Sequence, residues 1–330
     1  MGDNLNGKVA VVTGSGQGIG RAIAIGMAQE GAKVVTNNRC RGSTGYAFMT
    51  DSLIKALSEE KREWLRKEVE AAAGDAETTA KKINDMGGKA IPFFGDVSDF
   101  EVAHKLIQTA VDSFGKIDIL VNVVGTFGFS AIWDMTEEQW DHINLIKPKA
   151  HFNCIRHALP FMMEQKWGRI INCTSGAFKG SNRHTNYATA NAGVLGLTWS
   201  VAKEVYQYGI TCNAFAPDAK TRATFELEAY MMAVPEKDRP MPGRGSISAI
   251  TPPPEDLAPF IIYLATEEAA HISGSVFMVA GPRVAIFSEP EMQSSVFKYG
   301  GRWTVDELKQ QVPRGLLGRY RSPAAPPTPP

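Results

Sequence analysis

A glycine-rich turn near the start of the chain constrains the fold more than any other feature. The turn reads Thr-Gly-Ser-Gly-Gln-Gly-Ile-Gly from Thr13 to Gly20, and it follows the short apolar run 8–13. A helical pattern of apolar residues continues over 20–30, and a second apolar run covers 33–37. This order predicts a strand, a tight turn, a helix and a second strand, which together form the βαβ unit of a parallel sheet.

The remaining sequence repeats this alternation of strands and helices. Further strands are expected at 90–94, 117–122, 168–173, 210–214 and 275–279, and long helices at 102–114, 136–161 and 187–206. Pro148 is expected to kink or end a segment of the second of these helices. The sequence therefore predicts an α/β fold with a doubly wound parallel sheet of seven strands, the Rossmann arrangement.

The predicted sheet accounts for a single domain over 1–285, to which other segments are added. A helical insertion is expected at about 42–75, because Asp51 or Ser52 can begin a helix that reaches Val69, and a second helix is expected at 76–85. A long Met- and Pro-rich stretch lies at about 218–254. Residues 286–320 form a C-terminal extension, and the Pro-rich stretch 321–330 is expected to be disordered.

Charge and cysteine content exclude several classes of protein. Basic residues (Lys plus Arg) and acidic residues (Asp plus Glu) both number 35, so the chain has no net charge. A neutral chain gives no electrostatic sign of binding nucleic acid or an anionic membrane. No apolar run is long enough to cross a bilayer, and the first residues do not resemble a signal peptide. The four cysteines lack metal-ligand spacing. We therefore expect a cytoplasmic protein with free thiols and no metal.

The glycine-rich turn is predicted to hold the pyrophosphate of a dinucleotide. Gly14 permits the tight turn, Gly18 lets the backbone approach the anion, and Gly20 lets the helix pack closely on the sheet. Unpaired N–H groups at the start of the helix complete the anion site. Ser15, Gln17 and Ile19 belong to the same turn.

The end of the second strand bears on the choice between NAD and NADP. An acidic residue usually binds the adenosine ribose of NAD at this position, but the chain has Asn38 and Arg39 there. Arg39 could pair with a 2′-phosphate, which favours NADP, or it could be a solvated loop charge. Asp96, followed by Val97 after the third strand, could accept a hydrogen bond from the adenine or could cap its own turn.

Ser175 and Tyr187 are the candidate reactive residues. Ser175 follows the fifth strand and Tyr187 opens the next helix, so both are expected near the carboxyl ends of the strands, where ligands bind. A serine hydroxyl can hold a carbonyl oxygen, and a tyrosine can transfer a proton while a nicotinamide exchanges hydride. The alternative is a loop serine and a helix-start tyrosine with no shared role.

The glycine turn, Asn122-x-x-Gly125, Asn144, Ser175 and Tyr187 together resemble the classical short-chain dehydrogenases/reductases over about 5–280. The insertion and the stretch 212–222 look most like the 3-hydroxyacyl-CoA dehydrogenase domain of peroxisomal multifunctional enzyme type 2. The resemblance implies that Tyr187 is the general acid/base, that Ser175 orients the carbonyl, and that Asn144 holds a water or kinks a helix near the site. It also implies cofactor contacts for Asn122, Gly125, Asn191, Pro217 and Thr221, and a substrate lid at 218–254.

The same resemblance implies that the substrate is an apolar secondary alcohol or ketone, with a CoA-linked 3-hydroxyacyl thioester as one option. It also implies a homo-oligomer, either a dimer or a tetramer. Phe127, Phe129, Trp133 and Trp140 could line an apolar pocket or could be core residues. Basic residues on the inserted helix could meet the phosphates of a CoA carrier or form a solvated surface; they are Lys61, Arg62, Arg66 and Lys67.

The chain departs from the family where a lysine is expected four residues after Tyr187. Asn191 stands there instead. A unit charge about 4 Å from a phenolate stabilises it by about 4 kcal/mol at an effective dielectric near 20. The missing lysine could therefore raise the pKa of the Tyr187 phenol by about 3 units at most. Lys179, Arg183 and His184 are candidates to supply the charge. Two hypotheses follow: an NAD(P)-dependent oxidoreductase, and a nucleotide-binding pseudoenzyme or non-catalytic subunit of a dehydrogenase.

Overall fold

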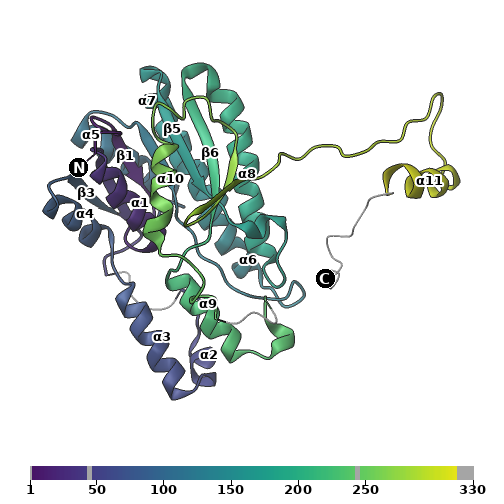
Figure 1. The fold of residues 1–330 in the computed structure, drawn as a ribbon, viewed down its shortest axis with the longest axis horizontal. Coiled ribbons are helices and arrows are strands. Elements are labelled where there is room, and N and C mark those ends of the chain that lie inside the picture. The colour runs from purple at the N-terminus through teal and green to yellow at the C-terminus, as the bar shows by residue number, and fades with distance from the viewer. Residues whose placement is uncertain (1, 43–46, 242–245, 318–330) are drawn as a thin grey trace. The chain divides into compact units, whose positions relative to one another are not determined.

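A central sheet organises the chain in the computed structural model, which describes residues 2–42, 47–241 and 246–317 (Figure 1). Within these residues the sheet has eight strands in the order β3-β2-β1-β4-β5-β6-β7-β8. The strands are β1 (Val9–Val12), β2 (Lys33–Asn38), β3 (Lys89–Phe94), β4 (Ile119–Asn122), β5 (Gly168–Cys173), β6 (Ile210–Pro217), β7 (Val276–Ala280) and β8 (Arg283–Ile286).

The strand order confirms the doubly wound parallel sheet. β1 pairs in parallel with both β2 and β4, so the order reverses on either side of β1. Ligands bind at such a reversal, outside the carboxyl ends of the strands. The sheet has one strand more than the seven predicted, because the chain turns at Gly281 (φ 60°) and β8 pairs antiparallel with β7. β8 is largely exposed and so lacks the apolar run by which the other strands were predicted.

Helices cover both faces of the sheet. One face carries α1 (Gly18–Gln29), α4 (Ala76–Asp85) and α10 (Ala258–Tyr263), and Figure 1 shows α1 and α10 side by side. The other face carries α5 (Phe100–Phe114), α7 (Ala150–Gln165) and α8 (Thr185–Val205). Two separate apolar clusters fill the two layers, and burial on both faces explains the almost continuous apolar runs of the central strands.

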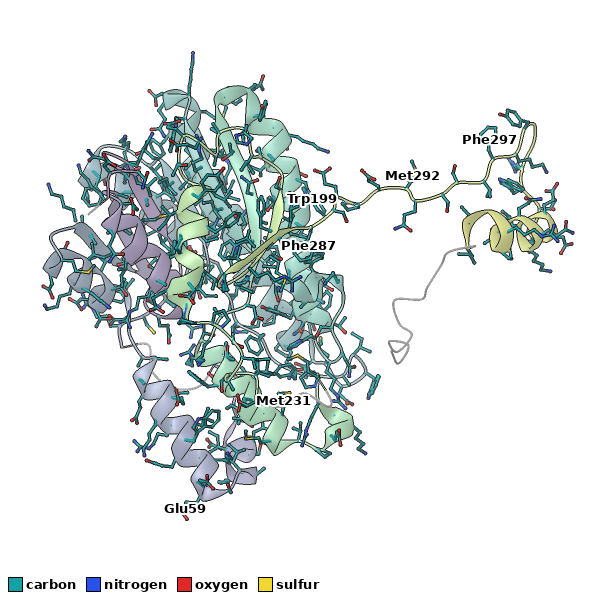
Figure 2. The ribbon with its side chains drawn as sticks, viewed as in Figure 1. Glu59, Trp199, Met231, Phe287, Met292 and Phe297 are labelled. Atoms are coloured by element: carbon teal, nitrogen blue, oxygen red, sulfur yellow. The ribbon has the colours of Figure 1, made fainter. Side chains whose placement is uncertain are left out.

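The insertion forms two helices, not the single long helix predicted. α2 (Asp51–Ala56) ends before Ser58, whose side chain accepts a hydrogen bond from Lys61 N and so begins α3 (Glu59–Ala71). Both helices pack on α9 (Arg222–Ala233) through a third apolar cluster, and Figure 2 shows Glu59 and Met231 on this group of helices. The insertion and the α9 segment therefore form one body beyond the strand ends.

The helical segment around Pro148 continues through a π turn. α6 (Glu137–Asn144) passes into a π segment (Leu145–Lys149) and then into α7. Proline lacks the N–H that an α-helix would use here, and single π turns accommodate such an interruption and often mark functional sites. Pro148 thus modifies the helix without ending it.

The chain divides into two compact units, Met1–Phe287 and Ser288–Pro330. In the first unit, Phe287 packs with Trp199 of α8 in a small apolar cluster (Figure 2). In the second, Thr304 caps α11 (Val305–Gln311), and Lys298 pairs with Glu307. The predicted disordered stretch 321–330 lies outside the described residues.

The other short helical segments are Gly176–Lys179, Tyr206–Tyr208, Glu236–Asp238, Pro254–Leu257 and Val312–Leu316. No helix in the described part of the chain has the length and apolar character that crossing a membrane requires.

Candidate functional site

A cleft of about 390 Å³ opens at the carboxyl ends of the strands, where the order reverses. It brings together most of the residues predicted to hold a dinucleotide. They are Gly14, Gln17, Gly18, Ile19, Gly20, Asn38, Arg39, Asp96, Val97, Gly125 and Thr221. The glycine-rich turn, the ends of β2, β3 and β4, and the start of α9 each contribute a wall.

The glycine turn has the geometry that close approach to an anion requires. Gly18 opens α1 with a φ of 54°, a conformation that side chains with a Cβ rarely adopt. A Cβ on Gly20 would collide with the carbonyl oxygen of Gly14, so only glycine lets α1 pack on the turn. Within the described residues, the buried Gln17 Oε1 and Asn38 Oδ1 have no hydrogen-bond partner, and both residues line the cleft. Buried polar atoms without partners fit a site built for a polar ligand.

Four residues predicted to bind the dinucleotide lie behind the lining of the cleft. Ser15 is buried, and its hydroxyl donates to Val12 O at 2.7 Å and accepts from Asn37 N at 2.9 Å. Asn122 donates from Nδ2 to Asn172 Oδ1 at 2.9 Å. Pro217 ends β6, and Asn191 is fully buried on α8. The contacts of Ser15 and Asn122 join neighbouring strands and so fix the shape of the cleft.

Two arginines near the end of β2 differ in their contacts. Arg41 pairs with Glu77 and lies over the ring of Phe94 at 4.6 Å. Arg39 lines the cleft, is exposed and forms no ion pair with another described residue. Arg39 is therefore the arginine that is available to a ligand.

Asp96 has a local role within its turn. Its Oδ1 accepts a hydrogen bond from Ser98 N at 2.9 Å, while Asp99 caps α5. One carboxylate oxygen is thus committed to the turn, although Asp96 also lines the cleft.

Ser175 and Tyr187 come together beyond the carboxyl end of β5. Ser175 caps a short 3-10 helix, where its Oγ accepts from Ala177 N at 3.3 Å. Burial raises the pKa of the Tyr187 phenol to about 12, although hydrogen bonding with Ser175 and Asn191 opposes this rise. A phenol with so high a pKa is almost fully protonated near neutral pH, so little phenolate is present to accept a proton, and proton transfer requires a further stabilising charge.

The three candidate cations of the 175–187 loop do not supply that charge. Lys179 is exposed and lies 5.5 Å from the ring of Phe287. Arg183 pairs with Asp238. Burial lowers the pKa of His184 to about 4, so this imidazole is neutral at neutral pH.

The two asparagines of the predicted site both use their amides on their own helices. Asn144 Nδ2 donates to Trp140 O at 2.9 Å, and Asn191 Nδ2 donates to Tyr187 O at 2.8 Å. Asn191 Oδ1 is buried and accepts no hydrogen bond from a described residue.

Lys147 is a residue of this region that sequence reasoning missed. The π segment carries it to the end of β5, where its Nζ donates to Cys173 O at 2.7 Å, and the side chain is 3% exposed. Burial lowers the pKa of Lys147. Its sequence position gives one signal, since a lysine directly before a mid-helix proline lies where the helix is irregular.

Aromatic side chains wall a second, smaller cavity of about 160 Å³ beside the cleft. Phe127 and Phe129 line it, and the ring of Phe127 lies 5.7 Å from that of Tyr187. His184 stacks on Phe129 at 4.0 Å, and Tyr230 stacks on the same ring at 4.5 Å. Two other predicted wall residues face outward, since Trp133 is 80% and Trp140 36% exposed.

A buried carboxylate connects the insertion to this cavity. Glu226 on α9 is fully buried and accepts hydrogen bonds from the backbone N–H groups of Ala47, Phe48 and Met49 at 2.9–3.3 Å. Ala47 lines both cavities and Phe48 the smaller one. Glu226 thereby fixes the start of the insertion as a wall of the site.

Comparison with known proteins agrees with this geometry. The family model for short chain dehydrogenases matches residues 8–48 and 52–228. Hydroxyacyl-CoA dehydrogenase ChsB1 of Mycobacterium tuberculosis is 31% identical over 325 residues, which cover 96% of this chain and 90% of that protein. The peroxisomal hydratase-dehydrogenase-epimerase of Neurospora crassa is 31% identical over 281 residues, which cover 85% of this chain and 27% of that protein.

A crystal structure of a short chain dehydrogenase from Mycobacterium avium superposes with a TM-score of 0.74 at 31% identity, over 97% of this chain and 98% of that one. The extent of these matches, together with the glycine turn and the Ser175–Tyr187 pair, confirms the predicted resemblance. The chain belongs to the short-chain dehydrogenase/reductase family of NAD(P)-dependent oxidoreductases.

Proposed function

We propose that this protein interconverts a secondary alcohol and a ketone with Tyr187 as the acid/base and Ser175 as the residue that orients the carbonyl. The observation that carries the proposal is the pairing of these two hydroxyls beside a cleft built for a dinucleotide. When bound there, the nicotinamide would supply the hydride chemistry.

The chain's own residues would divide the remaining work. The N-terminus of α1 and the glycine turn would bind the pyrophosphate. Ser175 Oγ would donate to the substrate oxygen, and Tyr187 would exchange a proton with the same oxygen. The aromatic side chains Phe127 and Phe129 would exclude water from the reacting carbon.

The aromatic wall favours an apolar substrate. Phe48, Phe127 and Phe129 present rings to the smaller cavity, next to Tyr187. The name of the M. tuberculosis relative, a hydroxyacyl-CoA dehydrogenase, points to hydroxyacyl substrates, so a 3-hydroxyacyl thioester is the substrate class we propose. On the inserted helix, Arg66 and Lys67 are engaged with Glu63, which leaves Lys61 and Arg62 as the residues for a CoA carrier to meet.

The cofactor we propose is NADP, with NAD as the alternative. Its support is Arg39, which lines the cleft without an ion pair to another described residue, whereas Arg41 is paired. A guanidinium matches the oxygens of a 2′-phosphate.

We also propose that the protein is a cytoplasmic homo-oligomer, a dimer or tetramer. Ala192, Gly193 and Gly196 leave a flat, exposed face on α8 against which a second copy could pack. The four cysteines are free, as a reducing compartment would keep them.

The test is Tyr187→Phe, assayed by the absorbance of the reduced nicotinamide with 3-hydroxyacyl thioesters and simple secondary alcohols. Turnover should fall by about 10²- to 10⁴-fold, the usual contribution of a general acid/base, while nucleotide affinity is unchanged. Tyr208→Phe, outside the site, is the matched control. Equal turnover in Tyr187→Phe and the native protein would remove Tyr187 from the reaction.

A second candidate function is a nucleotide-binding subunit without hydride transfer. The observation that favours it is Asn191 in place of a lysine, beside a phenol whose pKa burial raises to about 12. It predicts tight nucleotide binding and no turnover with any alcohol or ketone.

A further inference from the structure

The site holds a buried lysine whose burial needs a reason. Lys147 is 3% exposed, and within the described residues its ammonium donates one hydrogen bond, to Cys173 O. In the described part of the chain it forms no ion pair with a carboxylate. Removing an ammonium from water is costly, and such groups in clefts more often serve function than stability.

The lysine lies at the reactive end of the sheet and not elsewhere in the core. A Cβ added to Gly125, which lines the cleft after β4, would lie 2.7 Å from Lys147 Cε and 3.3 Å from Nζ. The absent side chain of Gly125 thus leaves the room that the ammonium occupies, next to the nucleotide cleft.

Cys173 links this lysine to the reactive tyrosine. Its carbonyl accepts from Lys147 Nζ, and its thiol is close enough to interact electrostatically with both Lys147 and the Tyr187 phenol. Lys147 and Tyr187 therefore flank the same residue at the end of β5.

The segments that carry Lys147 and Asn191 also adjoin. Pro148 follows Lys147 in the π segment, and its side chain lies 3.5 Å from where a Cβ on Gly193 would be. Gly193 is two residues after Asn191 on α8. An ammonium supplied from the π segment can thus serve the place where α8 offers only an amide.

We propose that Lys147 is the cation of this active site, so that the π segment supplies the ammonium that α8, with Asn191, does not. The proposal rests on the proposed oxidoreductase function. In alcohol oxidation the Tyr187 phenolate takes the hydroxyl proton, the carbonyl forms, and the carbon's hydride passes to the oxidised nicotinamide. Lys147 changes no covalent bond; its charge stabilises the phenolate.

The other titratable groups around Tyr187 do not compete for this role. Burial lowers the pKa of His151, which packs against Lys147, to about 3 and that of His184 to about 4, so both are neutral. Burial raises the pKa of the Cys173 thiol, so it is protonated. His142, on α6, lines the cleft and is exposed to solvent. Among these groups, Lys147 is left as the one that can carry a positive charge beside Cys173 near neutral pH.

The experiment compares Lys147→Met with Lys149→Met, an exposed lysine in the same π segment. Lys147→Met should lower turnover by about 10²-fold or more and move the rise of the oxidation rate to higher pH, since the phenol loses its stabilising charge. Nucleotide affinity should stay the same. Lys149→Met should change neither turnover nor the pH profile. An unchanged pH profile in Lys147→Met would overturn the proposal.

A reciprocal pair of substitutions guards against a merely structural role. Lys147→Asn should lose activity. The double variant K147N/N191K should be at least ten times more active than Lys147→Asn, because α8 then supplies the positive charge. Circular dichroism checks that each variant folds. A double variant no more active than Lys147→Asn would contradict the proposal that the site needs the positive charge of Lys147.

An activity-independent measurement separates this proposal from the proposed function. The phenol titration of Tyr187 is followed by NMR with ring-labelled tyrosine, assigned by Tyr187→Phe, in the presence of oxidised dinucleotide. A lower pKa in the native protein than in Lys147→Met supports the role of Lys147 even if no alcohol is oxidised, in which case only the proposed function fails. Equal pKa values overturn the role of Lys147 whatever the turnover.

Discussion

At the scale of single residues, the proposed preference for NADP can be tested at the end of β2. Arg39→Ala should weaken NADPH binding by about 10- to 100-fold, because hydrogen bonds to charged groups contribute about 1.5–3 kcal/mol, and should leave NADH binding unchanged. Quenching of tryptophan fluorescence measures both affinities. Arg41→Ala is the matched control, since Arg41 is paired with Glu77. An equal loss for NADPH and NADH would refute a 2′-phosphate contact.

His184 gives the fold a dependence on acid. The folded protein holds the pKa of His184 at about 4, below the ordinary value of 6.5, because the imidazole is buried. Between these values the unfolded chain binds more protons, so the free energy of unfolding should fall as pH drops, by about 1.4 kcal/mol per pH unit. Urea unfolding at pH 7, 6 and 5 measures the slope.

The variants His184→Phe and His271→Gln separate this effect from the other titrating groups. His184→Phe should flatten the slope below pH 6.5, whereas His271→Gln, at an exposed position, should not. The buried His151 has the same sign of effect, and its contribution remains in both variants. Parallel slopes in the native protein and His184→Phe would show that His184 does not carry the acid sensitivity.

At the scale of elements, we expect the packing of α1 on its turn to affect nucleotide binding. Gly20→Ala places a methyl group against Gly14 O and should displace the turn, at a cost of about 1–3 kcal/mol in the free energy of unfolding. Nucleotide affinity should fall at the same time. Calorimetry of binding and thermal unfolding measure the two effects.

A glycine on another helix provides the control. A Cβ on Gly196 of α8 meets no atom of the same chain within 4 Å, so in the single chain Gly196→Ala should stabilise the helix by about 1 kcal/mol and leave nucleotide affinity unchanged. If both substitutions had the same effect, helix propensity rather than close approach would explain Gly20.

The sequence predicted the elements well where local signals were strong. The helix 76–85 was predicted at both ends, and in the structure a capping box of Asp75 and Thr78 begins it. The break at Ser58 was missed because the apolar pattern continues across it, and β8 was missed because its residues are mostly exposed. Secondary structure that depends on pairing or on a single cap is hard to infer from periodicity.

The candidate site was predicted in part for the same reason. Glycine spacing predicted where the cleft lies, since the turn itself forms one of its walls. Lys147 could not be found that way, because a lysine in a helix is normally solvated and only the π segment turns it inward. The pocket walls at Phe48 and Glu226 depend on contacts between segments far apart in the sequence.

At the scale of the whole molecule, the first unit should function without the second. Residues 1–287 and 288–330 form separate compact units, and the cleft and the aromatic cavity lie in the first. A chain ending at Phe287 should therefore keep the thermal midpoint and nucleotide affinity of the full chain. Differential scanning calorimetry and binding calorimetry test this. A chain ending at Ala280, which also lacks β8, should be less stable, because β7 loses its partner.

The antiparallel direction of β8 determines at which edge of the sheet the chain leaves the first unit. β8 leads back from the rim that holds the cleft, so Ile286 lies beside Phe277 near the beginning of β7. A fluorescent protein or a surface tether fused directly after Phe287 would be attached at the edge of the sheet opposite the cleft. Small molecules would then enter and leave the cleft without obstruction from whatever is attached.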